Sequence, residues 1–175
     1  QTKKIKGDIL EFGVGRARSV ITTCHLINEN KIRKNYLAFD SFRGFGNITS
    51  NDKSYRNPKD GEWALSPKKQ FKYDIENIKK IISLHIYKNN FKNVKFIKGF
   101  VEDTLPKKIK KINSISFINL DLDLYSGHKV VLENTFEKLS KYGLIYFDDV
   151  IPKDKNPPFP GAYIAVKEFF YKKKN

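Results

Sequence analysis

Short, continuously apolar runs alternate along this chain with segments of helical periodicity. The apolar runs lie at residues 8–14, 36–40, 94–99, 114–121 and 143–149. Helical spacing of apolar residues is found at 19–28, 71–82, 131–139 and 162–171. Strands buried on both faces are continuously apolar, and the helices between them cover a parallel sheet. The sequence therefore predicts an α/β fold with a doubly wound, mostly parallel sheet and helices on both faces, which binds ligands outside the carboxyl ends of its strands.

The length of 175 residues fits a single domain, predicted to span 1–175. Residues 44–70 are rich in Gly, Asn, Ser and Asp, which indicates a long loop. Because long ordered loops are commonly functional, this loop is predicted to act as a lid. The single cysteine, Cys24, excludes an intrachain disulfide. No run approaches the roughly 18 apolar residues of a membrane span and no stretch is typical of a signal peptide, so we expect a cytoplasmic protein without a membrane partner.

The chain carries 34 Lys and Arg residues against 19 Asp and Glu, a net charge of +15. Such an excess attracts phosphate backbones. It consists mainly of lysine spread along the whole chain, without the paired arginine and aromatic residues of a base-stacking surface. We interpret it as a solvated basic surface and expect no nucleic-acid partner. The lysine-rich segments 107–111 and 172–174 keep a nucleic-acid-binding module as an alternative.

Two glycines follow the first apolar run, in the stretch GDILEFGVGRARS. Gly13 and Gly15 allow a sharp turn into a helix and a close approach of a ligand to the backbone. The dinucleotide-binding fingerprint requires a third glycine where this chain has Arg18, which argues against a bound pyrophosphate. Glu11 would repel phosphate and suits a cationic amino group instead.

Asp40 ends the second apolar run, where an acid can accept hydrogen bonds from both hydroxyl groups of a ribose. This position fits NAD and an adenosyl ligand equally well, so a nicotinamide-dependent oxidoreductase is a second alternative. Taken alone, Asp40 also fits an Asx turn at the start of the following loop.

Four aspartates follow the last two apolar runs, Asp121 and Asp123 after one and Asp148 and Asp149 after the other. Their carboxylates would repel one another at one edge of the sheet unless a hard divalent cation, Mg²⁺, neutralises them. Because Asp121 and Asp123 alternate along an extended segment, we expect them to face opposite ways. One would then bind the metal and the other would be free to act as a base.

Several stretches occur in this chain in the order found in one enzyme family: GDILEFGVGRARS (7–19), FDSFRGF (39–45), FIKGFVEDTLP (96–106), LDLDLYS (120–126) and YGLIYFDDV (142–150). With them the chain resembles the macrocin O-methyltransferase family, class I methyltransferases that use S-adenosylmethionine and Mg²⁺ to methylate sugar hydroxyls. The resemblance implies an O-methyltransferase acting on a hydroxyl of a sugar or similar vicinal diol, with a small-molecule or saccharide acceptor. It also implies that the last strands of the methyltransferase sheet are absent from this sequence. A homo-oligomer and an inactive family member serving as a partner both stay open.

The resemblance assigns roles to particular residues. Cofactor-binding positions are implied at Glu11, Gly13, Gly15, Ser19, Asp40, Ser41, Gly99, Phe100 and Val101. Metal ligands are implied at Asp121, Asp148 and Asp149. Asp123 matches the general base, so Asp123 and the ligand Asp121 are the predicted catalytic residues. His128, a second candidate base, is expected to be a surface residue.

Overall fold

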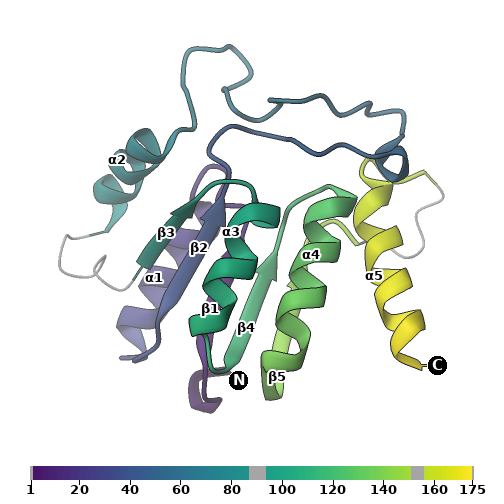
Figure 1. Ribbon diagram of the computed structural model, residues 1–175. Coiled ribbons are helices and arrows are strands. Elements are labelled where there is room, and N and C mark those ends of the chain that lie inside the picture. The colour runs from purple at the N-terminus through teal and green to yellow at the C-terminus, as the bar shows by residue number, and fades with distance from the viewer. Residues whose placement is uncertain (1, 87–93, 151–155, 175) are drawn as a thin grey trace.

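The computed structural model describes residues 2–86, 94–150 and 156–174, which form one parallel sheet with helices on both faces (Figure 1). The strands of the described residues are β1 (Asp8–Phe12), β2 (Tyr36–Asp40), β3 (Val94–Lys98), β4 (Ile115–Leu120) and β5 (Leu139–Phe147). All pair in parallel, in the order β3-β2-β1-β4-β5. The predicted α/β class is therefore confirmed.

The strand order reverses at β1, which pairs with β2 on one side and with β4 on the other. At its carboxyl end, Phe12 lies opposite both Phe39 of β2 and Leu120 of β4. Connections on either side of such a reversal diverge, which leaves a crevice beyond the strand ends. The fold thus places its ligand crevice beside the glycine-rich stretch that follows β1.

The helices divide into two layers (Figure 1). The α-helices are α1 (Arg18–Glu29), α2 (Ile75–His85), α3 (Val101–Lys108), α4 (Tyr125–Thr135) and α5 (Pro160–Lys174). Short 3-10 helices are η1 (Thr2–Lys4), η2 (Ser50–Asp52), η4 (Ile109–Lys111) and η5 (Phe136–Lys138). One hydrophobic core joins α1 and α2 to one face of the sheet, and a second joins α3, α4 and α5 to the other. None of the helices in the described ranges is long and apolar enough to cross a bilayer.

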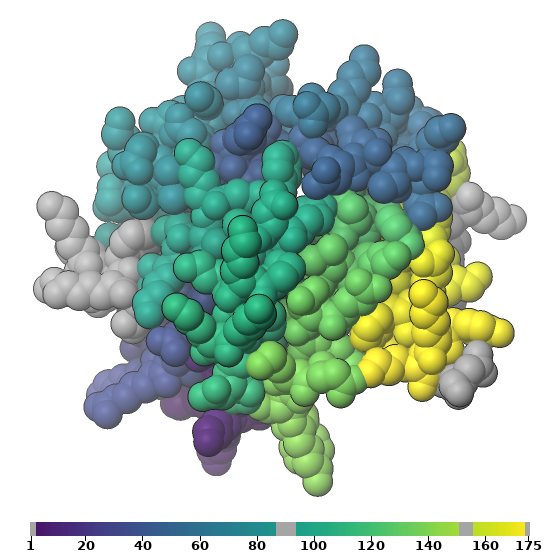
Figure 2. Space-filling model, viewed as in Figure 1, coloured from purple at the N-terminus to yellow at the C-terminus, as the bar shows by residue number. Residues whose placement is uncertain are grey.

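The segment between β2 and α2 crosses the carboxyl edge of the sheet, reaches the start of α5 and returns to α2 (Figure 1). In the space-filling view its blue atoms lie along the upper rim of the molecule, above α3 and α4 (Figure 2). The hydroxyl group of Ser54 donates a hydrogen bond to the carbonyl oxygen of Pro158 at 2.6 Å. The rings of Phe45 and Phe159 also meet edge to face at 5.8 Å. These contacts hold two parts of the segment against the residues that lead into α5.

Two predicted helices have different limits in the structure. The helix expected from residue 71 begins at Ile75, because the carboxylate of Asp74 accepts a hydrogen bond from the backbone N–H of Asn77 at 3.0 Å and caps it there. The helix expected at 131–139 is α4, which begins at Tyr125. Strand β5 starts at Leu139 rather than at 143.

Helix α3 was not among the predicted elements. Its sequence contains Pro106 and only two buried apolar residues, Val101 and Leu105, one turn apart. A proline within a segment of helical spacing normally indicates a helix end. The predicted strand at 94–99 and the helix at 162–171 agree with β3 and α5 to within a few residues.

Candidate functional site

A cavity of about 470 Å³ opens at the carboxyl ends of the strands, beside the point where the strand order reverses. The predicted site residues that line it are Gly13, Gly15, Ser19, Asp40, Ser41, Phe100, Val101, Asp121, Asp123, Asp148 and Asp149. Residues from the 44–70 loop, including Trp63, line it as well. The sheet therefore brings together side chains from all along the sequence, as expected for strand ends that share one edge.

Gly13 joins the end of β1 to its neighbours on both sides. Its N–H donates to the carbonyl oxygen of Phe39 at 2.9 Å, and the N–H of Asp121 donates to the carbonyl oxygen of Phe12 at the same distance. With φ at 90°, a Cβ atom on Gly13 would lie 1.7 Å from the carbonyl oxygen of Asp121. Gly13 is thus required where the glycine-rich turn packs against the end of β4. A Cβ atom on Gly15, by contrast, would meet nothing within 4 Å.

The carboxylate of Asp40 organises the turn after β1. One oxygen accepts hydrogen bonds from the N–H groups of Val14 at 2.7 Å and Gly15 at 3.2 Å, and the other accepts from the N–H of Phe42 at 2.6 Å. Burial raises the pKa of Asp40, while the three N–H donors act against that rise. The hydrogen bond from Phe42 forms an Asx turn at the start of the loop, so the expected Asx turn is present. A carboxylate has about four acceptor positions, so the residue keeps capacity for a ribose hydroxyl.

Glu11 is buried, and its carboxylate accepts hydrogen bonds from the hydroxyl groups of Ser19, at 2.6 Å, and Tyr36. Burial raises the pKa of Glu11 from its ordinary 4.5 to about 7, although both hydrogen bonds favour the ionised form. Glu11 does not itself line the cavity, whereas Ser19 does. The serine therefore connects the buried carboxylate to the cavity wall.

Phe100 and Val101, at the start of α3, form another part of the wall. The backbone N–H of Gly99, which precedes them, donates to the carbonyl oxygen of Asp40 at 3.0 Å, so this turn is tied to the end of β2. Gly99 adopts φ of 131° and does not line the cavity itself. The guanidinium group of Arg43 lies 5.9 Å from the ring of Phe100. This side of the cavity thus presents the aromatic ring of Phe100 and the aliphatic side chain of Val101, which suit a heterocyclic base.

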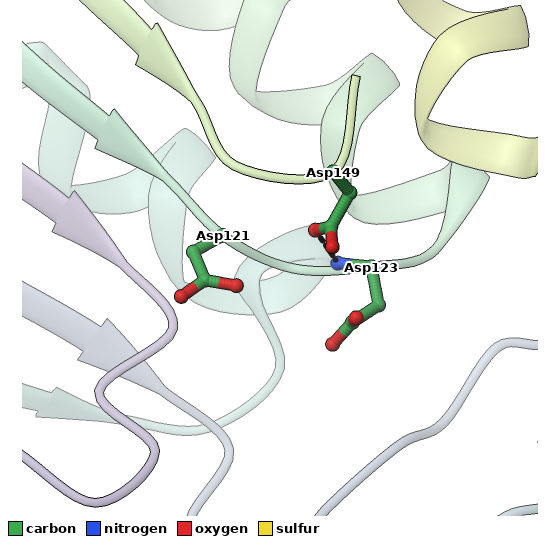
Figure 3. Close-up of side chains that lie close together, drawn as sticks. All are labelled: Asp121, Asp123 and Asp149. Carbon is green, nitrogen blue, oxygen red and sulfur yellow. Dashed lines mark hydrogen bonds between the residues drawn. The ribbon is translucent and has the colours of Figure 1, made fainter. Parts of the chain in front are cut away.

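Three carboxylates converge at the other side of the cavity (Figure 3). Oxygen atoms of Asp121, Asp123 and Asp149 all lie within 4.8 Å of one another. The backbone N–H of Asp123 donates to Asp149 at 3.0 Å. Burial, and then the charge of Asp149, raise the pKa of Asp121 to about 7, and burial also raises the pKa values of Asp123 and Asp149. A donor set made only of carboxylate oxygens fits a hard cation such as Mg²⁺.

The expectation that Asp121 and Asp123 face opposite ways is wrong. Strand β4 ends at Leu120, and Asp123 has a left-handed backbone with φ of 58°, so the alternation of an extended strand does not continue through it. Both side chains approach Asp149 as a result. Asp148 lines the same cavity but is exposed, and it accepts a hydrogen bond from the hydroxyl group of Tyr146 at 3.2 Å. Its role as a metal ligand stays a prediction.

His128 is fully buried in α4, so its expected place on the surface is wrong. Its Nδ1 atom lies 2.9 Å from the carbonyl oxygen of Leu124, one turn earlier in the helix. Burial lowers the pKa of His128 to about 4 and keeps the ring neutral. His128 does not line the cavity, whereas Asp123 does, and the role of Asp123 as the base stays a prediction.

Residues 1–169 match the macrocin O-methyltransferase (TylF) family. The chain belongs to this family. Demethyldecarbamoylnovobiocin O-methyltransferase of Streptomyces niveus is 26% identical to this chain over 153 residues, which make up 83% of this chain and 53% of that protein.

Two solved structures share the fold of this macrocin O-methyltransferase family member. CalS11, a calicheamicin methyltransferase, superposes with a TM-score of 0.79 and 26% identity over 95% of this chain and 65% of its own. The O-methyltransferase NovP gives a TM-score of 0.74 with 24% identity over 97% of this chain and 65% of its own. The present chain thus spans about half the length of the Streptomyces niveus enzyme and 65% of each solved chain.

One cluster in this family member was not predicted from its sequence. The guanidinium group of Arg16, in the glycine-rich turn, lies 6.0 Å from the ring of Trp63 and 5.9 Å from the ring of Tyr73. All three residues line the cavity. The single tryptophan in a loop rich in glycine and charged residues could be noticed in the sequence, but no local sequence pattern connects it to Arg16. The cluster joins the 44–70 loop to the turn after β1.

Proposed function

We propose that this chain carries out methyl transfer from S-adenosylmethionine, assisted by Mg²⁺, to a hydroxyl group of a sugar or similar vicinal diol. One observation carries the proposal: the carboxylates of Asp121, Asp123 and Asp149 converge in the same cavity as the glycine-rich turn and Asp40. Membership of the macrocin O-methyltransferase family supports the reaction type. Relatives named for novobiocin and calicheamicin support a saccharide-bearing acceptor.

The proposed cofactor site follows the walls of the cavity. The amino group of the methionine part would lie near Ser19, with the buried carboxyl group of Glu11 behind it, and a bound ammonium group would favour the ionised form of that carboxyl group. Asp40 would accept a hydrogen bond from the ribose, beside Ser41. The base would stack on Phe100, next to Val101. The open space in front of Gly15 leaves room for the ligand to approach the backbone.

The proposed metal site uses the carboxylates of Asp121 and Asp149, with Asp148 as the third ligand implied by family resemblance. Bound Mg²⁺ would hold two neighbouring hydroxyl groups and lower the pKa of the one that attacks. Asp123 would accept the proton of that hydroxyl group while its oxygen bonds to the methyl carbon and the carbon–sulfur bond breaks.

The 44–70 loop is the proposed lid over the acceptor. Trp63 is 44% exposed and lines the cavity, so its ring can pack against a sugar that enters there. Contact with Arg16 holds the same ring toward the turn that would bind the cofactor. Closure of such a loop excludes water and completes the site.

We further propose that residues 1–175 act as a single domain and that the protein acts in the cytoplasm.

Isothermal titration calorimetry with S-adenosylhomocysteine and with NAD⁺ tests the cofactor. We expect S-adenosylhomocysteine to bind and NAD⁺ not to bind, and the opposite result would support the oxidoreductase. Mn²⁺ titration followed by electron paramagnetic resonance tests the metal site. Asp149→Asn and Asp148→Asn should weaken Mn²⁺ binding, whereas Asp103→Asn, an exposed acid in α3, should not. Methyl transfer that continues in EDTA would remove the metal from the proposal.

A further inference from the structure

Helix α4 begins two residues after Asp123, and its N-terminus is not capped by the side chain at its own cap position. The residue at the cap position, Leu124, makes no side-chain hydrogen bond to the first turn. The first N–H groups of a helix have no partner within the helix and need one from elsewhere. In this chain the partner comes from the 44–70 loop, where the carboxylate of Asp52 accepts a hydrogen bond from the backbone N–H of Tyr125 at 2.7 Å.

Asp52 is held firmly enough to serve as an anchor. It is only 1% exposed, and its second carboxylate oxygen accepts hydrogen bonds from the N–H and the hydroxyl group of Thr49, at 2.7 and 2.8 Å. Gly161, in the first turn of α5, covers the contact so closely that a Cβ atom there would lie 2.0 Å from an Asp52 oxygen. The position of this carboxylate is therefore set by the loop, by α4 and by α5.

A second contact joins the same loop to the start of α4. The hydroxyl group of Ser126 lies 3.2 Å from the carbonyl oxygen of Asn47 and donates to Glu102 of α3 at 2.7 Å. The loop thus contacts two successive residues of the first turn of α4. On the other side of the short connection between β4 and α4, Asp123 is held through its N–H by Asp149.

We infer that Asp52 is a positioning residue for the candidate metal and base site. Through the N–H of Tyr125 it fixes the first turn of α4, and thereby the direction in which Asp123 and Asp121 leave β4. The orientation of these carboxylates then depends on the 44–70 loop being in place. The inference rests on the proposed function, because it assigns the loop a part in forming the site as well as in covering the acceptor.

The test compares Asp52→Ala with Asp52→Asn, since asparagine is also a good cap and keeps an acceptor oxygen. Ser54→Ala is the matched control, because it removes a contact of the same loop with Pro158 that does not involve α4. Three quantities are measured for each variant. They are the Kd of Mn²⁺, the Kd of S-adenosylhomocysteine and the hydrogen-exchange rate of the Tyr125 amide.

Loss of a residue that orients metal ligands typically weakens metal binding by about tenfold or more. We expect Asp52→Ala to weaken Mn²⁺ binding by about tenfold and to speed exchange of the Tyr125 amide, with the Kd of S-adenosylhomocysteine nearly unchanged. Ser54→Ala should stay close to the wild type. Asp52→Asn should lie between the wild type and Asp52→Ala, because its one carbonyl oxygen can still accept from the Tyr125 N–H while the hydrogen bond from the Thr49 N–H is lost. Asp52→Ala with a lower melting temperature but unchanged Mn²⁺ affinity and amide exchange would overturn the inference, because Asp52 would then only support the fold.

Two further outcomes are separable. If the wild type binds no Mn²⁺, the metal part of the proposed function fails, and exchange of the Tyr125 amide still decides whether Asp52 fixes this turn. If Asp52→Ala does not fold, Asp52→Ser carries the same comparison, because its side chain is shorter by one bond and keeps a polar atom at the site. Equal exchange rates in Asp52→Ser and wild type would then refute the inference.

Discussion

The Glu11→Gln variant should become more stable relative to the wild type as the pH rises. Burial raises the pKa of Glu11 from 4.5 to about 7, so the folded state holds this proton more tightly than the unfolded state does. Stability from this group is therefore fully present below pH 4.5 and is lost as the pH rises to about 7. Each pKa unit corresponds to about 1.4 kcal/mol, which gives a total of about 3 kcal/mol. Glutamine at this site does not titrate and should not show the loss.

Urea unfolding followed by circular dichroism, at a series of pH values from 4.5 to 8, measures this effect. The quantity compared is the difference in unfolding free energy between wild type and Glu11→Gln, which removes the contribution of other titrating groups. From the lowest to the highest pH, the wild type should lose about 3 kcal/mol of unfolding free energy relative to Glu11→Gln. Glu133→Gln, at an exposed position of α4, should give a constant difference. A constant difference for Glu11→Gln as well would show that the buried carboxylate does not carry its proton to neutral pH.

Other substitutions test the rest of the site. His128→Gln should show the opposite trend in the difference in unfolding free energy. Burial lowers the pKa of His128 to about 4, so the wild type gains about 3 kcal/mol of unfolding free energy as the pH rises from 4 to 6.5. A constant difference in the same unfolding series would contradict this. Gly13→Ala should cost more than about 3 kcal/mol of unfolding free energy, since its Cβ atom meets the Asp121 carbonyl oxygen. Gly15→Ala should cost about 1 kcal/mol, from backbone strain alone. Equal melting temperatures for the two variants would refute the packing argument. Arg16→Ala should remove about 1 kcal/mol of contact with Trp63 and expose this single tryptophan to acrylamide quenching; unchanged quenching would mean that Arg16 does not hold the loop.

The order of strands and helices could be predicted because strands buried on both faces have a simple signature in sequence. Residues 36–40, for example, are β2 in both the prediction and the structure. The start of α4 could not be predicted, because its capping carboxylate, Asp52, lies far away in the chain. Asp123 and Ser126 are residue types that commonly cap helices, but the cap position is occupied by Leu124, whose side chain makes no capping hydrogen bond. The prediction therefore placed this helix too late, where its apolar spacing becomes regular.

The composition of the site was more predictable than its geometry. Gly13, Asp40 and Asp121 follow from the rule that ligands bind at the carboxyl ends of parallel strands, and all three line the cavity. The direction of the Asp123 side chain depends on the left-handed backbone of Asp123 itself, three residues beyond the end of β4. The alternation of apolar residues along a strand gives no sign of such a conformation. Contacts such as that of Arg16 with Trp63 join segments that only the folded chain brings together.

The central position of β1 has a consequence for how the chain is made. Among the described strands β1 is synthesised before the others, and it pairs on one side with β2 and on the other with β4. The middle of this sheet therefore cannot form until β4 has been synthesised. Asp149, at the far end of β5, is the last of the three clustered acids to emerge. The electrostatic repulsion among Asp121, Asp123 and Asp149 is therefore complete only after most of the described hydrophobic core, whose burial opposes that repulsion, has been synthesised.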